Sequence, residues 1–259
     1  MIEFTDIDLK SANEFDIESI KTALLKHLVV VVRGQNLTPE DEVNFCQRIG
    51  KCQYLKHERT KHIAVGEYIL RVTGEKNEHG EEGLFGHTSA LDWHANQASN
   101  PDRSPLIWLY SVKGSEGSRT SWIDMAHAYR ELPDDLKEEI QDIEITLGYK
   151  KGSYSNSDFF VEHHATDKPF KLVHTNDAGI TGLYFPFLQI FGMVGKTQEE
   201  FNSIMSRLKE HVLQPEFAYH HDWQDGDVVI SEQWLSIHKR WDFEGMENRM
   251  LHRIAFDYR

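Results

Sequence analysis

Apolar residues near the start of the chain change from a helical pattern to a strand pattern. Between residues 17 and 27 they recur three or four positions apart, which places one set of residues on one face of a helix, namely Ile17, Ile20, Ala23 and Leu24. The run at 28–32 that follows is β-branched and short, as in a buried strand. We therefore expect a helix that leads directly into a central strand.

A second helix is predicted from the signals at its two ends. Residues 38–41, with the sequence Thr-Pro-Glu-Asp, provide an N-cap, a proline in the first turn and an acid three positions after the cap. Gly50 is a residue type at which helices commonly end. Together these signals predict a helix over residues 39–49.

The pattern beyond residue 50 is that of a β-rich fold. Short β-like runs alternate with loops rich in Gly, Asn and Asp, and this spacing favours a sandwich or a barrel. No repeat or linker divides the chain, so we expect one β-rich α+β domain over residues 1–259, with helices flanking the β core. The predicted strands are Tyr68–Val72, Leu106–Val112, Ile143–Leu147, Gly182–Phe187, Asp227–Ser231 and Met250–Phe256, and the further helices are Asp124–Leu132 and Thr197–Leu213.

Composition narrows the classes of partner. The formal charge of −14 argues against nucleic acid, because phosphate binding requires clustered Lys and Arg. No apolar stretch approaches the roughly 20 residues that span a bilayer, and Met1 is not followed by a secretory signal, so we expect no membrane partner and a cytoplasmic location. Cys46 and Cys52 fit neither a disulfide framework nor a zinc site and are predicted to be reduced structural thiols.

Candidate metal ligands lie in two separated segments. In residues 91–97, LDWHANQ, His94 and Asn96 are two positions apart and would project from the same face of a strand. Residues 223–238 form a turn into an apolar strand and end at His238. Two histidines and one carboxylate can bind iron and leave positions open for a bidentate 2-oxo acid and for O2.

These segments, their order and their spacing resemble the taurine dioxygenase family of Fe(II)/2-oxoglutarate oxygenases. The resemblance extends over nearly the whole chain. LVVVVRGQNLTPEDEVNFCQRIG (28–50) resembles the family's opening strand and helix, and WHAN (93–96) stands where the family has WHTD. WQDGDVVISEQWLSIH (223–238) resembles the segment around the distal histidine. Arg249 and Arg253 follow this segment's end at the family's spacing, +11 and +15.

The resemblance implies a double-stranded β-helix (jelly-roll) core that binds Fe(II) and the co-substrate 2-oxoglutarate. His94 and His238 would be metal ligands. Arg249 would bind the distal carboxylate of 2-oxoglutarate together with the hydroxyl of Thr120, because guanidinium groups bind carboxylates through paired hydrogen bonds. Arg253 would lie closer to the metal, near the substrate or the other end of the co-substrate. The implied reaction is oxidation of a C–H bond by O2, by default hydroxylation, with release of succinate and CO2.

The substrate is expected to be a small polar molecule. An amino acid or another compound with an anionic group fits best, with Arg253 as its anchor. Loops within residues 54–62, 82–90 and 151–160 are expected to line its pocket. Relatives of this type often associate, so a homo-oligomer is left open.

The resemblance breaks at Asn96, where the family has a carboxylate ligand. An amide oxygen can coordinate iron but brings no charge. Three interpretations stay open: a neutral third ligand in a working oxygenase, a halogenase-like site that binds chloride, or an inactive module that only binds a small carboxylate. In related halogenases Ala or Gly replaces the carboxylate, and Asn leaves less room for a halide. Asp92, two positions before His94, is a further candidate for the missing charge.

Two pairs of neighbouring histidines look like metal ligands in the sequence but are not expected to bind a metal. The pairs at 163–164 and 220–221 are direct neighbours, and neighbours on a strand point to opposite faces. Both pairs are therefore predicted to be surface or loop residues.

Overall fold

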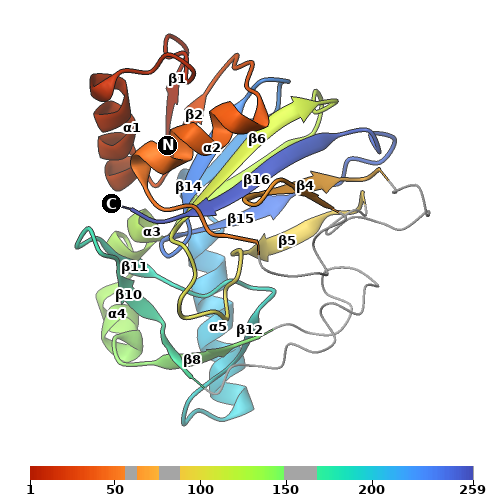
Figure 1. Cartoon of the computed structure of the whole chain (residues 1–259). Helices are drawn as coiled ribbons and strands as arrows, with labels where there is room; N and C mark the ends of the chain where they lie inside the picture. Colours follow the sequence, from red (N-terminus) through yellow and green to blue (C-terminus); the bar gives the residue numbers. More distant parts are fainter. Residues whose placement is uncertain (56–62, 76–87, 149–167, 259) are drawn as a thin grey trace.

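Two β-sheets pack face to face to form the core (Figure 1). The computed structural model describes residues 1–55, 63–75, 88–148 and 168–258. In spatial order the larger sheet contains β1 (Ile2–Phe4), β2 (Val29–Val32), β14 (Val228–Glu232), β6 (Leu106–Lys113), β16 (Met250–Phe256), β4 (Ile69–Thr73) and β3 (Ala64–Val65). The smaller sheet contains β13 (Ala218–Asp222), β7 (Arg119–Asp124), β15 (Ser236–Arg240) and β5 (Leu91–His94).

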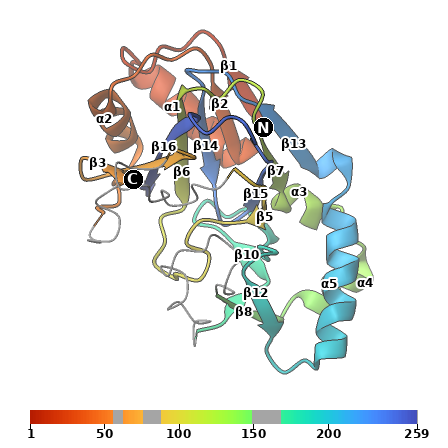
Figure 2. The same ribbon diagram turned by 90° about the vertical axis from the view of Figure 1, so that its right-hand side faces the viewer.

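Helices and two small sheets surround this pair. Figure 2 shows α1 and α2 on the outer side of the larger sheet, and α4 and α5 at the opposite end of the molecule. The helices are α1 (Glu14–His27), α2 (Pro39–Ile49), α3 (Met125–Arg130), α4 (Asp134–Ile140) and α5 (Gln198–Val212). The small sheets are β12 (Ile190–Met193), β8 (Glu144–Leu147) and β9 (Phe170–Lys171), and β10 (Val173–Thr175) with β11 (Thr181–Leu183).

The larger sheet is covered on both faces, which explains its continuous apolar strands. All four valines of β2 are buried. Val30 and Val32 pack with residues of α1 and α2, whereas Val29 and Val31 pack against the side that carries Trp122 of the smaller sheet. Successive strand residues point to opposite faces, so a strand buried on both faces has no polar alternation.

Most of the predicted elements are present, with one correction. The helix at 39–49 is confirmed, and both halves of its capping box form between Thr38 and Asp41. The predicted strand Gly182–Phe187 is wrong after its first two residues, because β11 ends at Leu183. Pro186 has no N–H to donate to a strand partner, and its carbonyl instead accepts the N–H of Gln189 in a turn.

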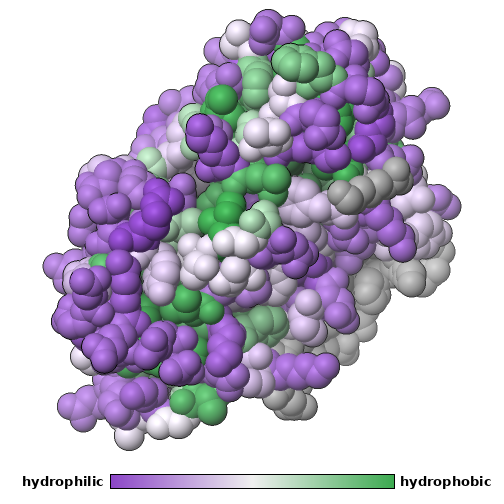
Figure 3. Space-filling model, turned by 90° about the vertical axis from the view of Figure 1, so that its left-hand side faces the viewer, coloured by the Kyte–Doolittle hydropathy of each residue, from purple (hydrophilic) through white to green (hydrophobic). Residues whose placement is uncertain are grey.

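The surface and the thiols agree with the composition. Figure 3 shows a face on which hydrophilic residues predominate and apolar residues form small separate groups. Cys46 and Cys52 are buried free thiols, as predicted. In the part of the chain that the structure describes, no helix is both long and apolar enough to cross a membrane.

Candidate active site

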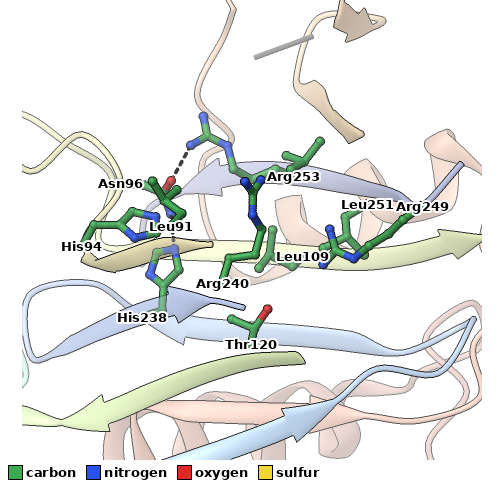
Figure 4. A pocket seen from close by; sticks show the side chains of 11 residues that line it. Leu91, His94, Asn96, Leu109, Thr120, His238, Arg240, Arg249, Leu251 and Arg253 are labelled. Carbon is green, nitrogen blue, oxygen red and sulfur yellow. Dashed lines mark hydrogen bonds between the residues drawn. The ribbon is translucent and has the colours of Figure 1, made fainter. Parts of the chain in front are cut away.

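His94 and His238 meet between the two sheets. β5 and β15 are antiparallel neighbours, and His238 is the register partner of His94. Their ring centroids are 4.1 Å apart, and both side chains line one pocket (Figure 4). The structure therefore brings together two imidazoles that are far apart in the sequence.

Both imidazoles are held in the neutral form. The Nδ1 atom of His94 lies 2.7 Å from the backbone carbonyl of Asp92 and can only donate there, which leaves the ring's lone pair on Nε2. Burial lowers the pKa of His94 to about 4. Burial, and then the proximity of His94 and of the cationic Arg253, lower the pKa of His238 well below its ordinary value. Neutral imidazole is the form that binds a metal ion.

Asn96 lies beside this pair and bonds to an arginine. It follows the end of β5, is buried, and its backbone N–H donates to Gln233 Oε1 at 2.8 Å. Arg253, which projects from β16 in the larger sheet, donates from Nη1 to Asn96 Oδ1 at 2.9 Å. The Asn96 Nδ2 atom is 3.5 Å from Nε2 of His238. The third predicted ligand position is thus occupied by an amide with a cationic neighbour.

Arg249 and Thr120 lie in the same pocket, farther along it (Figure 4). Arg249 is 1% exposed, and its Nε donates to Ser118 Oγ at 2.9 Å. Its Nη1 atom is buried and has no hydrogen-bond partner among the described residues. Thr120 Oγ1 accepts the indole N–H of Trp223 at 2.9 Å, so its own proton can still be donated to a ligand.

Arg240 is a pocket residue that the sequence analysis missed. It is buried, its Nη2 donates to the carbonyl of Ser89 at 2.9 Å, and its guanidinium carbon lies 5.0 Å from the ring centroid of Phe243. The signal was present: Arg240 follows His238 by two positions, so on a regular strand the two side chains share a face. Apolar side chains complete the described lining, namely Val72, Leu91, Leu109 and Leu251.

Two predictions from the sequence need correction, one for Asp92 and one for His221. Asp92 does not supply the missing carboxylate, because its side chain is half exposed and forms an ion pair with Lys239 at 3.3 Å. His220 is exposed, as predicted, but His221 is fully buried, with Nε2 3.1 Å from Asp227 Oδ2. The pair at 163–164 lies outside the described residues, as do most of the loops expected to line the substrate pocket.

The donor set fits a ferrous ion and a dicarboxylic acid. Neutral imidazoles are ligands suited to iron. A buried guanidinium with an unbonded N–H is energetically costly unless a ligand accepts from it, and a carboxylate is the acceptor of best geometry. In the described part of the chain no three residues of the types His, Cys, Asp and Glu converge as a metal site, and the side chain beside the two histidines is the amide of Asn96.

The sequence of this chain is similar to those of known proteins over nearly its whole length. The family model described as "Taurine catabolism dioxygenase TauD, TfdA family" matches residues 2–255. The chain belongs to this family. Its TauD/TfdA relatives include pentalenolactone F synthase of Streptomyces avermitilis, 25% identical over 94% of this chain and 86% of the relative. The alpha-ketoglutarate-dependent 2,4-dichlorophenoxyacetate dioxygenase of Burkholderia sp. is 22% identical over 93% of this chain and 85% of the relative.

Solved structures agree on the fold. AAD-2 in complex with Mn(II) and N-oxalylglycine matches with a TM-score of 0.79 at 22% identity, over 99% of this chain and 94% of that chain. A taurine dioxygenase from Burkholderia xenovorans matches with a TM-score of 0.77 at 22% identity, over 99% of this chain and 85% of that chain. The fold is the jelly-roll of these enzymes, and this TauD/TfdA protein is an Fe(II)/2-oxoglutarate-dependent dioxygenase.

Proposed function

We propose that this chain, as a single domain over residues 1–259, hydroxylates a C–H bond of a small polar substrate with an anionic group. His94 and His238 would bind Fe(II), and Asn96 stands at the third ligand position. The observation that carries the proposal is the pocket itself, which joins two neutral imidazoles to a buried arginine with an unbonded N–H. Bound Fe(II) would activate O2 and couple the conversion of 2-oxoglutarate to succinate and CO2 with oxidation of the substrate.

The pocket offers candidate partners for the distal carboxylate and the carbon chain of 2-oxoglutarate. Arg249 would bind the distal carboxylate through its Nη1 atom, while Ser118 holds the Nε side of the same guanidinium. The Thr120 hydroxyl would donate to the same carboxylate, because its acceptor side is already engaged by Trp223. The side chains of Leu109 and Leu251 would exclude water from the carbon chain between the two ends.

The substrate's anionic group would be held by arginine. Arg240 and Arg253 both line the pocket, and both are buried. Arg253 already donates one N–H to Asn96. We therefore assign the substrate's anionic group to Arg240 and Arg253 together and not to Arg253 alone. An amino-acid-like molecule is the substrate class that we favour.

The test is succinate formation by the protein loaded anaerobically with Fe(II) and then exposed to O2, 2-oxoglutarate and a panel of small amino acids and carboxylates. We expect substrate-dependent succinate and a product that gains one oxygen atom. His238→Ala should lose both activity and iron binding. Absence of iron binding and of 2-oxoglutarate turnover in the unaltered protein would contradict the proposal, and a chloride-dependent mass gain would identify halogenation in place of hydroxylation.

A further inference from the structure

Phe243 is a buried aromatic residue that contacts two arginines of the pocket. Its ring centroid lies 5.0 Å from the guanidinium carbon of Arg240 and 4.8 Å from that of Arg249. The side chain is 3% exposed, and within the described part of the chain it lies outside the apolar groups that form the core. Packing of the apolar core therefore does not account for this ring.

The guanidiniums of Arg240 and Arg249 act on each other. Both side chains line the pocket, and both are buried. Burial first, and then the charge of Arg240, lower the pKa of Arg249 to about 9. Like charges repel in a region of low dielectric, so a fixed separation between the two groups requires contacts that favour their charged forms.

An aromatic face is a contact of this kind. The face of a phenyl ring carries negative potential and attracts a cation within about 6 Å of its centroid, most strongly where water is excluded. A carboxylate would also favour the charged forms, but it would accept from the same arginine N–H groups that an anionic ligand needs. The Phe243 ring can hold both guanidiniums without occupying these N–H groups.

Backbone hydrogen bonds fix the position of this ring relative to both arginines. The N–H of Phe243 donates to the carbonyl of Thr88 at 2.9 Å, and its carbonyl accepts the N–H of Met246 at 3.0 Å. The carbonyl of Met246 in turn accepts the N–H of Arg249 at 2.9 Å. The residue after Thr88 accepts from Arg240 Nη2 through its carbonyl, also at 2.9 Å. The ring and the two arginines are therefore held by one connected set of bonds.

We propose that Phe243 is a positioning residue for anion binding, whose ring holds the guanidiniums of Arg240 and Arg249 at a fixed separation. The inference rests on the proposed function, in which Arg249 binds the distal carboxylate of 2-oxoglutarate and Arg240 helps to bind the substrate's anionic group. Phe243 is not among the described residues that line the pocket, so it acts through the two arginines. A ligand then meets guanidiniums that are already in place, and less binding energy is lost in ordering them.

The test is the affinity of the Mn(II)-loaded protein for N-oxalylglycine, measured by calorimetry. A trifluorinated phenylalanine incorporated at position 243 keeps nearly the size of the ring but removes the negative potential of its face. We expect the dissociation constant of N-oxalylglycine to rise about fivefold or more. The affinity for Mn(II) should not change, because the two histidines are not in contact with this ring. Phe243→Leu, which removes the ring, should weaken N-oxalylglycine binding further, whereas Phe243→Tyr should keep most of the affinity.

Phe45 provides the matched control, because it is a buried phenylalanine of α2 whose ring contacts Trp108. The same fluorinated residue at position 45 should leave the affinity for N-oxalylglycine unchanged. Equal affinity of the unaltered protein and the fluorinated Phe243 variant would overturn the inference and leave the proposed function standing, and so would an equal loss in the fluorinated Phe45 variant. Failure of the unaltered Mn(II)-loaded protein to bind N-oxalylglycine would overturn both.

Discussion

Burial sets the protonation of single side chains in the core, and Glu232 shows this most clearly. Glu232 ends β14, is fully buried, and accepts the backbone N–H groups of Trp234 at 3.1 Å and Leu235 at 2.7 Å. These bonds favour the ionised carboxylate, but desolvation outweighs them and raises the pKa of Glu232 to about 7. The folded protein therefore holds this proton more tightly than the unfolded chain does.

This shift predicts a pH-dependent contribution to stability. The ordinary pKa of Glu232 is 4.5, so between about pH 4.5 and pH 7 the unfolded chain releases the proton first and the contribution of this group to stability falls as pH rises. Glu232→Gln removes this dependence. Relative to the unaltered protein, the variant should gain on the order of 2–3 kcal/mol in free energy of unfolding between pH 5 and pH 8. Urea unfolding at both pH values measures it, and a pH-independent difference would show that Glu232 titrates normally.

At the level of elements, the register of β14 depends on the turn that precedes it. Gly226 in this turn has a φ of +88°, and a Cβ built there would lie 2.5 Å from the carbonyl oxygen of Gln35. Its own carbonyl accepts the N–H of Gln35 at 2.7 Å, and its N–H donates to Ser111 at 2.8 Å. The turn therefore connects β14 to both neighbouring segments, and only glycine satisfies its conformation and its close contact.

A matched pair of glycines separates these two requirements. Gly117 has a φ of +89° but open space around its Cβ position. Gly117→Ala should cost about 1 kcal/mol from backbone strain alone. Gly226→Ala should cost about 3 kcal/mol or more, because the same strain is joined by overlap with Gln35. Chemical denaturation of both variants measures the difference, and equal losses would show that the Gln35 segment moves away freely.

At the level of the whole molecule, the pocket joins the two sheets. His94 and His238 come from the smaller sheet, whereas Arg253 projects from β16 of the larger sheet and Arg249 directly precedes that strand. A metal ion bound by the two histidines would contact only the smaller sheet, whereas a co-substrate bound to the metal and to Arg249 would connect both sheets. Ligands that bind only the folded state stabilise it by mass action.

Thermal unfolding tests this arrangement with Mn(II) and N-oxalylglycine, which do not turn over. Mn(II) alone should raise Tm modestly, and N-oxalylglycine should add a further increase. At one hundred times the dissociation constant each ligand contributes about 2.7 kcal/mol. Arg249→Gln should keep the Mn(II) shift and lose the N-oxalylglycine shift, whereas His94→Ala should lose both. An N-oxalylglycine shift that survives Arg249→Gln would place the distal carboxylate elsewhere.

Much of the fold could be predicted because its signals are local. The cap at Thr38 with Pro39 defines a helix start whatever the surroundings, and the apolar runs of β2, β6, β14 and β16 are buried in any arrangement that covers both faces. Short strands with mixed patterns, such as β13 and β15, were not predicted as strands. Their pairing partners are distant in sequence, so local propensity does not reveal them.

The sequence by itself determined the residue types of the site and their order: His94, Thr120, His238, Arg249 and Arg253, together with the departure at Asn96. Only the tertiary structure decided which partner the Asn96 oxygen takes, that Arg240 joins the pocket, that Asp92 turns to Lys239, and that His221 is buried. The physical reason is that hydrogen bonds and charges act through space. Spacing along a strand places a side chain on a face, but the opposite sheet determines what that side chain meets there.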